Sequence, residues 1–151
     1  MQISDQLPGF RFELNARHIV QGAAASRDWQ PLHHDHQWAR DKAGTGDIIL
    51  NTPSQVGWML RYVTDVLGPD CRPGAIRLRM KRPLLPGSAL VFGGTVVSDE
   101  RDSVGLRWLC IDVTIAVGER IASQAQIMLA LPDPVSPWTI SPWQPREMPR
   151  D

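Results

Sequence analysis

The sequence predicts an α+β protein in which one long helix is followed by a run of strands. Two observations lead to this prediction. Apolar residues recur at helical spacing between residues 52 and 67, and from residue 76 onward the apolar period changes to two. One helix followed by consecutive strands is typical of the α+β class. With 151 residues, the chain has the length of a single domain that can bury a core.

The long helix is expected over Thr52–Leu67. Its apolar face consists of Val56, Met59, Leu60, Val63 and Leu67. Thr52 is a suitable N-cap, and Pro53 then takes the first helical position, where its missing N–H costs nothing. Gln55 stands three residues after Thr52 and completes a capping-box pattern. Gly68, which is followed by proline, ends the helix.

Shorter elements are expected before this helix. They are a turn at Pro8-Gly9, a strand with Phe10, Phe12 and Leu14 on its apolar face, a short helix over Ala16–Ala25 and a brief helix over His36–Ala43. Asn15 is a good N-cap for the first of these helices, because its side chain can accept from a free backbone N–H. Gly44 ends the second helix.

Four strands are expected after the long helix. Apolar residues alternate at Ile76, Leu78 and Met80 in the first, over Leu90–Val97 in the second, over Val104–Val117 in the third and from Ile121 to Leu131 in the fourth. Gly93 and Gly94 suggest a bend or bulge in the second strand. A polar turn is expected over Asp99–Ser103. Gly118-Glu119 is a tight connection, so the last two strands should form a hairpin.

The composition limits the kind of partner. Lys plus Arg and Asp plus Glu are both 16, so the net charge is zero, whereas nucleic-acid binding favours a basic face. Cys71 and Cys110 do not suggest a disulfide framework and fit reduced thiols in a cytosolic protein. No signal peptide and no membrane span are visible in the sequence. A cytoplasmic protein that binds neither nucleic acid nor membrane is therefore expected.

The segment Ala24–Asp35 contains a candidate acid/base pair. Asp28 stands five residues before His33, with Pro31 between them. Proline lacks an N–H and biases the preceding residue away from helical angles, so both side chains should lie on a bent, non-helical segment. Two titratable groups on one short loop can transfer protons to and from a bound molecule. The alternative is that both are ordinary loop residues.

The same loop continues as His33-His34-Asp35-His36, which raises the question of a metal site. No second cluster of ligands accompanies this run, and neither cysteine has a CxxC partner. Consecutive residues also rarely all point at one ion. We therefore expect no metal here. Asp35 is expected to cap or brace the loop, and His34 and His36 to be surface residues.

This loop resembles the hydratase motif of the MaoC-like dehydratases, which reads approximately Ala-Ser-Gly-Asp-x-Asn-Pro-Ile-His-x-Asp. The matching residues are Ser26, Asp28, Pro31, His33 and Asp35. Arg27 replaces the glycine of the motif and Gln30 replaces its asparagine. The resemblance extends over about residues 8–131. It implies the hot-dog fold, an antiparallel sheet wrapped around one long helix. It also implies that Asp28 and His33 form the catalytic dyad of an enoyl-CoA hydratase or 3-hydroxyacyl-CoA dehydratase, a lyase.

The start of the long helix is a second candidate site. A helix N-terminus offers free N–H groups and a partial positive charge. In the resembled family this place usually reads His-Gly, and the glycine N–H binds the thioester oxygen. Asn51-Thr52 stands there in this sequence, and Thr52 keeps its N–H. The resemblance thus implies that Asn51 and Thr52 bind substrate; the alternative is a capped helix with a structural role only.

A basic strip lies near the end of the first strand after the long helix. It contains Arg77, Arg79, Lys81 and Arg82. Arg79 and Arg82 are candidates for contacts with the phosphates of a coenzyme A substrate, because guanidinium groups bind phosphate oxygens well. A solvated outer face is the alternative reading of the same residues.

Residues 26–39 and 48–69 are similar to one subgroup, the small chain of two-chain enoyl-CoA hydratases that act on steroid side chains. A second hot-dog chain completes the active unit there. The similarity implies lipid or steroid metabolism, a coenzyme A thioester as substrate without a further cofactor, and a homodimer or a heteromer with a second hot-dog chain. Two other functions stay open: a non-catalytic or partner-dependent subunit of a heteromeric hydratase, and an acyl-CoA thioesterase.

The end of the chain differs in composition from the rest. Six of the 13 prolines lie between Pro132 and Pro149. We expect a hot-dog domain over residues 1–131 and a proline-rich tail over 132–151, without helix or strand. Trp138, Ile140 and Trp143 can bury apolar area. The tail is therefore expected to lie across its own sheet or a neighbouring subunit, away from the loop with the acid/base pair.

Overall fold

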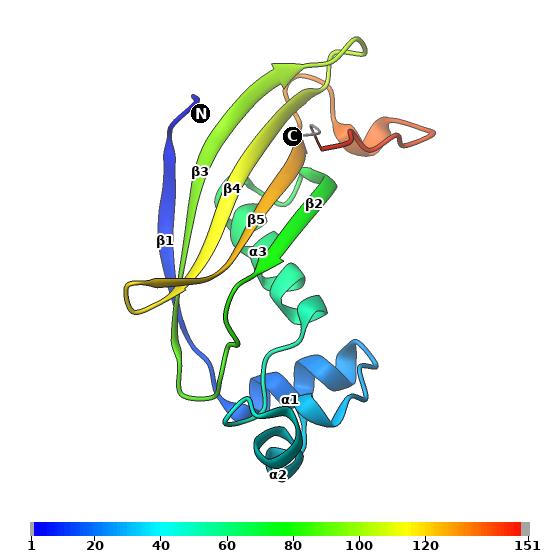
Figure 1. The fold of residues 1–151 in the computed structure, drawn as a ribbon. Coiled ribbons are helices and arrows are strands. Elements are labelled where there is room, and N and C mark those ends of the chain that lie inside the picture. The colour runs from blue at the N-terminus through cyan, green and yellow to red at the C-terminus, as the bar shows by residue number, and fades with distance from the viewer. Residues whose placement is uncertain (1, 149–151) are drawn as a thin grey trace.

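A computed structural model describes residues 2–148 and has the predicted α+β architecture. Five antiparallel strands form one sheet in the order β1-β3-β4-β5-β2, and the sheet curves around helix α3 (Figure 1). The strands are β1 Gln6–Glu13, β2 Arg72–Met80, β3 Ala89–Arg101, β4 Arg107–Val117 and β5 Arg120–Leu131. The helices are α1 Ala16–Ala25, α2 His36–Trp38 and α3 Thr52–Leu67, with single helical turns at Pro31–His33, Ala39–Ala43 and Pro137–Thr139.

Helix α3 has the predicted bounds, but its cap differs from the prediction. Asn51, not Thr52, is the N-cap: its side chain accepts a hydrogen bond from the Ser54 N–H. The expected capping box through Gln55 is therefore wrong. The Gln55 side chain is buried and accepts a hydrogen bond of 2.6 Å from the Ser123 hydroxyl on β5. A buried amide needs such a partner, so Gln55 ties the helix to the sheet.

Strand β1 contains the Pro8-Gly9 pair, so the predicted turn at this pair is wrong. The pairing of β1 with β3 shifts its register between Leu7 and Phe10, which makes the pair a β-bulge. Leu7 is buried before the bulge, whereas Phe10 after it is 49% exposed. The bulge changes the direction in which the side chains after it point, so the apolar face of β1 is only partly buried.

Strand β3 is longer than predicted and runs to Arg101. Its irregularity falls between Val96 and Ser98, so the prediction of a bulge at Gly93 and Gly94 is wrong. Gly94 has another role: a Cβ there would lie 3.2 Å from Leu7 and 3.3 Å from Tyr62 of α3. The missing side chain lets the helix approach the sheet closely. The polar turn moves accordingly to residues 102–106.

The main core lies between α3 and the concave face of the sheet. Its fully buried members include Met59, Val63, Phe92, Leu109, Ile111, Ile115, Ile127 and Leu129. The apolar residues of β4 that were predicted to share a face do so, since alternate residues of a strand point to one side. No helix in the described part of the chain, residues 2–148, is long and apolar enough to cross a membrane.

The outer face of the sheet is covered at one end by the C-terminal segment. A second apolar cluster there contains Leu106, Trp108, Cys110, Met128 and Ala130. Trp143 stacks on Trp108, with ring centroids 5.5 Å apart, and the Arg72 guanidinium lies 4.0 Å from the Trp143 ring centroid. The described part of the tail therefore lies across its own sheet, on the side of the molecule away from α1 and α2 (Figure 1). Trp138 departs from the prediction, because it stays 56% exposed.

Candidate active site

The loop that follows α1 places Asp28 and His33 side by side. The helix ends at Ala25 with Ser26 as its C-cap, and Arg27 then adopts φ +54°, in the left-handed region that favours glycine. The resembled motif has glycine at this position, and arginine adopts this conformation only at a steric cost. Pro31 opens a single 3-10 turn that carries His33, so the predicted non-helical segment contains one short helical turn.

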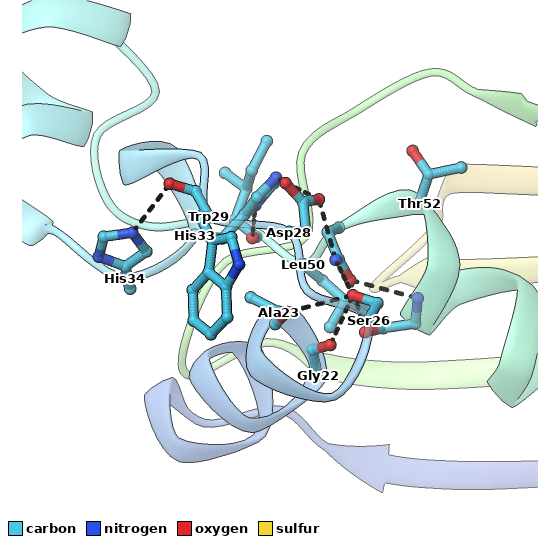
Figure 2. Close-up of polar contacts among 12 residues, drawn as sticks. Gly22, Ala23, Ser26, Asp28, Trp29, His33, His34, Leu50 and Thr52 are labelled. Atoms are coloured by element: carbon cyan, nitrogen blue, oxygen red, sulfur yellow. Dashed lines mark hydrogen bonds and ion pairs between the residues drawn. The ribbon is translucent and has the colours of Figure 1, made fainter.

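His33 is held by one hydrogen bond that fixes its orientation. The side chain is buried, and its Nδ1 lies 2.8 Å from the Ile49 carbonyl oxygen. A carbonyl oxygen can only accept, so Nδ1 carries a proton and donates. Nε2 then points at the Asp28 carboxylate, 3.3 Å from Oδ2 (Figure 2). The ring can donate to Asp28 only when it is the doubly protonated imidazolium.

Asp28 is the more accessible member of the pair. Its side chain is 24% exposed, and its backbone N–H donates to the Ala23 carbonyl at the end of α1. Oδ2 accepts from the Asn51 side-chain amide at 3.0 Å. Among residues 2–148, no side chain or backbone group hydrogen-bonds to Oδ1. The pair thus presents one free carboxylate oxygen and one imidazole nitrogen to a bound molecule.

Thr52 lies at the first turn of α3, next to Asn51. Its side chain is exposed, points away from the Asp28–His33 pair, and its hydroxyl lies 3.5 Å from the Met80 sulfur (Figure 2). The Thr52 N–H is one of the first-turn groups that have no acceptor within a helix. Asn51 itself is 2% exposed and fully engaged with protein groups. One of these groups is the Asp28 carboxylate, a contact that the sequence pattern does not predict.

The basic strip is not part of this arrangement. Arg77 and Arg79 alternate with Ile76 and Leu78, which pack against the main core, so the arginines lie on the opposite, outer face of the sheet. Both line a polar groove of about 460 Å³ on that face. Arg82 follows the strand and is exposed. The structure does not bring Arg79 to the Asp28–His33 pair.

Asp35 and His36, which follow His33 in the same loop, have partners of their own. Asp35 accepts from the Trp38 N–H and caps α2, as predicted. His36 pairs with Asp47. The hydrogen bond from His36, together with the Ile48 N–H, lowers the pKa of the Asp47 carboxyl. Within residues 2–148, no three His, Cys, Asp or Glu side chains come together in a group that could hold a metal ion.

A larger cavity, about 710 Å³, lies elsewhere and was not anticipated from the sequence. It is bounded by β1, α1 and α3, and its aromatic lining comes from Phe10, Phe12, Trp58, Tyr62 and Phe92. Neither Asp28, His33 nor Thr52 lines it. Its lining is predominantly apolar and also includes the polar residues His18, Gln21, Arg61 and Asp65.

Comparison with known proteins identifies the family. No family model matches the sequence. A curated relative from Mycobacterium tuberculosis, the 3-oxo-4,17-pregnadiene-20-carboxyl-CoA hydratase beta subunit, is 37% identical over 95 residues, which are 61% of this chain and 70% of the relative. The chain belongs to the MaoC-like hydratase family. The resemblance to a chain of a steroid side-chain hydratase is thereby confirmed.

Solved structures show the fold of this family. A chain of the ChsH1–ChsH2 complex from Mycobacterium tuberculosis superposes with a TM-score of 0.79 at 27% identity, over 87% of this chain and 98% of that one. The (R)-hydratase from A. caviae involved in PHA biosynthesis gives 0.77 at 19% identity, over 87% and 98%. A MaoC-like dehydratase from Rhodospirillum rubrum gives 0.76 at 16% identity, over 87% and 92%. The fold is therefore the hot-dog fold that the resemblance implied.

Proposed function

We propose that this chain catalyses the hydration of a 2-enoyl-CoA thioester to a 3-hydroxyacyl-CoA, or the reverse dehydration. The observation that carries the proposal is the contact between Asp28 and His33. His33 is anchored through Nδ1 to the Ile49 carbonyl, and its Nε2 lies 3.3 Å from Asp28 Oδ2. Two proton-transfer groups at this distance can act on one water molecule.

In the proposed reaction, the water lies between the free Oδ1 of Asp28 and the substrate. Asp28 takes a proton from the water as its oxygen bonds to C3. The C2–C3 double bond becomes a single bond, and C2 takes a proton from Nε2 of the His33 imidazolium. Asp28 then returns its proton to His33 across their contact, so both groups recover their starting states.

The thioester oxygen gains negative charge while C3 is attacked. The Thr52 N–H at the start of α3 is the proposed donor to this oxygen, because a first-turn N–H has no acceptor within the helix. The helix dipole adds a partial positive charge at the same place. Such preorganised donors contribute large rate effects in sites that exclude water. The structure gives no comparable support for phosphate contacts by Arg79 or Arg82, since Arg79 lies on the outer face of the sheet.

We also propose that the active unit contains a second hot-dog chain. The curated relative is the beta subunit of a hydratase, and the ChsH1–ChsH2 complex contains two named chains. The sheet ends at β1 and β2, and exposed edge strands are usually paired or covered. By analogy with the relative, we propose that the substrate is a coenzyme A thioester of a steroid side chain. A cytoplasmic location and the lack of a further cofactor remain predictions from the sequence.

An assay on the purified chain tests this function. The chain is incubated with 2-enoyl-CoA substrates, first alone and then with the second chain of the Mycobacterium tuberculosis complex as a surrogate partner. We expect loss of the enoyl absorbance and formation of 3-hydroxyacyl-CoA, at least when the partner is present. Release of free coenzyme A thiol instead would show an acyl-CoA thioesterase, and an unchanged substrate under both conditions would contradict the proposal.

A further inference from the structure

We propose that Asn51 is a positioning residue that fixes the Asp28 carboxylate to the start of α3. The inference rests on the proposed function, because it assigns Asn51 a part in placing the catalytic base. In this role Asn51 does not contact substrate. It makes the acid on the loop and the N–H of Thr52 on the helix one rigid unit.

The hydrogen bonds of Asn51 use its whole side chain. Oδ1 accepts from the Ser54 N–H at 3.2 Å and from the Ser54 hydroxyl at 2.5 Å. Nδ2 donates to Ser26 Oγ at 2.8 Å and to Asp28 Oδ2 at 3.0 Å. With 2% exposure, the amide has no room to turn toward solvent. Both N–H groups and the carbonyl oxygen of the amide are thus satisfied within the protein.

The partners also decide which way the amide faces. The Asp28 carboxylate can only accept, and the Ser26 hydroxyl already donates to the Gly22 carbonyl. Both therefore need a donor, which only the NH₂ end of Asn51 supplies. The Ser54 N–H needs an acceptor, which only the oxygen end supplies. A flipped amide would set an oxygen against a carboxylate, so the orientation follows from the chemistry of the partners.

No other common cap residue meets these requirements. Serine and aspartate cap helices as well as asparagine does. A serine side chain, however, ends before the position of Nδ2, and an aspartate would set a second carboxylate against Asp28. Asparagine alone accepts from the helix and donates to the acid with one short side chain.

The surrounding backbone connects Asn51 to the rest of the dyad. His33 is held by the Ile49 carbonyl, two residues before Asn51, so one short segment orients both members of the pair. Helix α1 packs closely at the same place: a Cβ on Gly22 would overlap the Ser54 hydroxyl. Loss of Asn51 should therefore shift the Asp28 carboxylate relative to the proposed water molecule, while both reacting groups, Asp28 and His33, are still present.

The test compares two asparagine caps. Asn15 caps α1 by accepting from the His18 N–H at 3.0 Å, and it does not contact Asp28. Asn51→Ser and Asn15→Ser both keep a good cap residue. We expect both variants to fold, and Asn51→Ser to melt below Asn15→Ser, because it also removes the two hydrogen bonds that the buried amide donates. Only Asn51→Ser should lower kcat, by about 10–100-fold, with KM little changed, because misplacement of a reacting group acts on the chemical step.

A crystal structure of Asn51→Ser gives a readout that needs no activity. We expect the Asp28 carboxylate to leave its place beside His33 Nε2. An Asp28 in its wild-type position, or a kcat equal to that of Asn15→Ser, would overturn the inference. The proposed function fails separately, if Asp28→Asn keeps full activity. An inactive Asp28→Asn with a fully active Asn51→Ser would refute the positioning role alone.

Discussion

Replacing Asp28 with asparagine is expected to lower kcat for enoyl-CoA hydration by at least ~100-fold, because general acid/base groups contribute about 10²–10⁴-fold each. Asparagine keeps the shape of the side chain and can still accept from Asn51, so the loop should keep its structure. It cannot take a proton from water. His33→Asn should lower kcat by a similar factor, because asparagine has no proton-transfer group at the position of Nε2. Asparagine can still donate to the Ile49 carbonyl, so the local structure should be kept.

The loss of kcat in the double variant Asp28→Asn/His33→Asn shows whether the two residues act together or contribute to catalysis independently. Residues that act as a unit show strongly non-additive losses, so we expect the double variant to be about as impaired as either single one. Asp41→Asn, an exposed acid on the neighbouring turn, is the control and should keep full activity. Turnover within a few-fold of wild type in either single variant, with an unchanged melting temperature, would rule out the assignment of the dyad.

Trp108→Ala is expected to have the largest effect on stability, about 3–5 kcal/mol, which is the usual loss for a large buried aromatic residue. Trp108 is 1% exposed and stacks on Trp143 of the tail. Its indole N–H donates to Asp102 at 2.8 Å. Burial raises the pKa of the Asp102 carboxyl, but this hydrogen bond and those from the backbone N–H groups of Leu106 and Val104 outweigh burial and lower the pKa. Chemical denaturation of the variant measures the loss.

Trp138→Ala is the matched control for this prediction. Trp138 is also a tryptophan beside Arg72, but it is 56% exposed. Exposed residues usually contribute less than about 1 kcal/mol, so the two variants should differ clearly. Equal losses in the two variants would contradict the description of the outer cluster as a second core that holds the tail.

The local elements were predictable from the sequence because their signals are local. The spacing of Val56, Met59 and Val63 gave the bounds of α3, and the glycine after Leu67 marked its end. The bulge at Pro8-Gly9 was misread as a turn, because its conformation depends on pairing with β3, more than 80 residues further along the chain. Likewise, Thr52 looked like a cap in the sequence, while the side chain that reaches Ser54 belongs to Asn51.

The candidate site was predictable only where a motif spans consecutive residues. Asp28 and His33 belong to one motif, and the structure brings them together. The contact between Asn51 and Asp28 joins residues 23 positions apart, and no periodicity reports such a contact. One signal was present in the sequence: Asn51 directly precedes the helix, and asparagine is among the most favoured N-cap residues. The second function of Asn51, as a hydrogen-bond donor to Asp28, depends on the fold.

A crystal structure with a 3-hydroxyacyl-CoA bound, in the presence of the partner chain, shows whether Asp28 and His33 face the reacting carbons. We expect Asp28 Oδ1 to lie within hydrogen-bond distance of the substrate hydroxyl and His33 Nε2 to face C2. We also expect the Thr52 N–H to donate to the thioester oxygen. A thioester bound elsewhere, such as in the aromatic cavity between β1, α1 and α3 with Asp28 and His33 facing empty solvent, would contradict the proposed function.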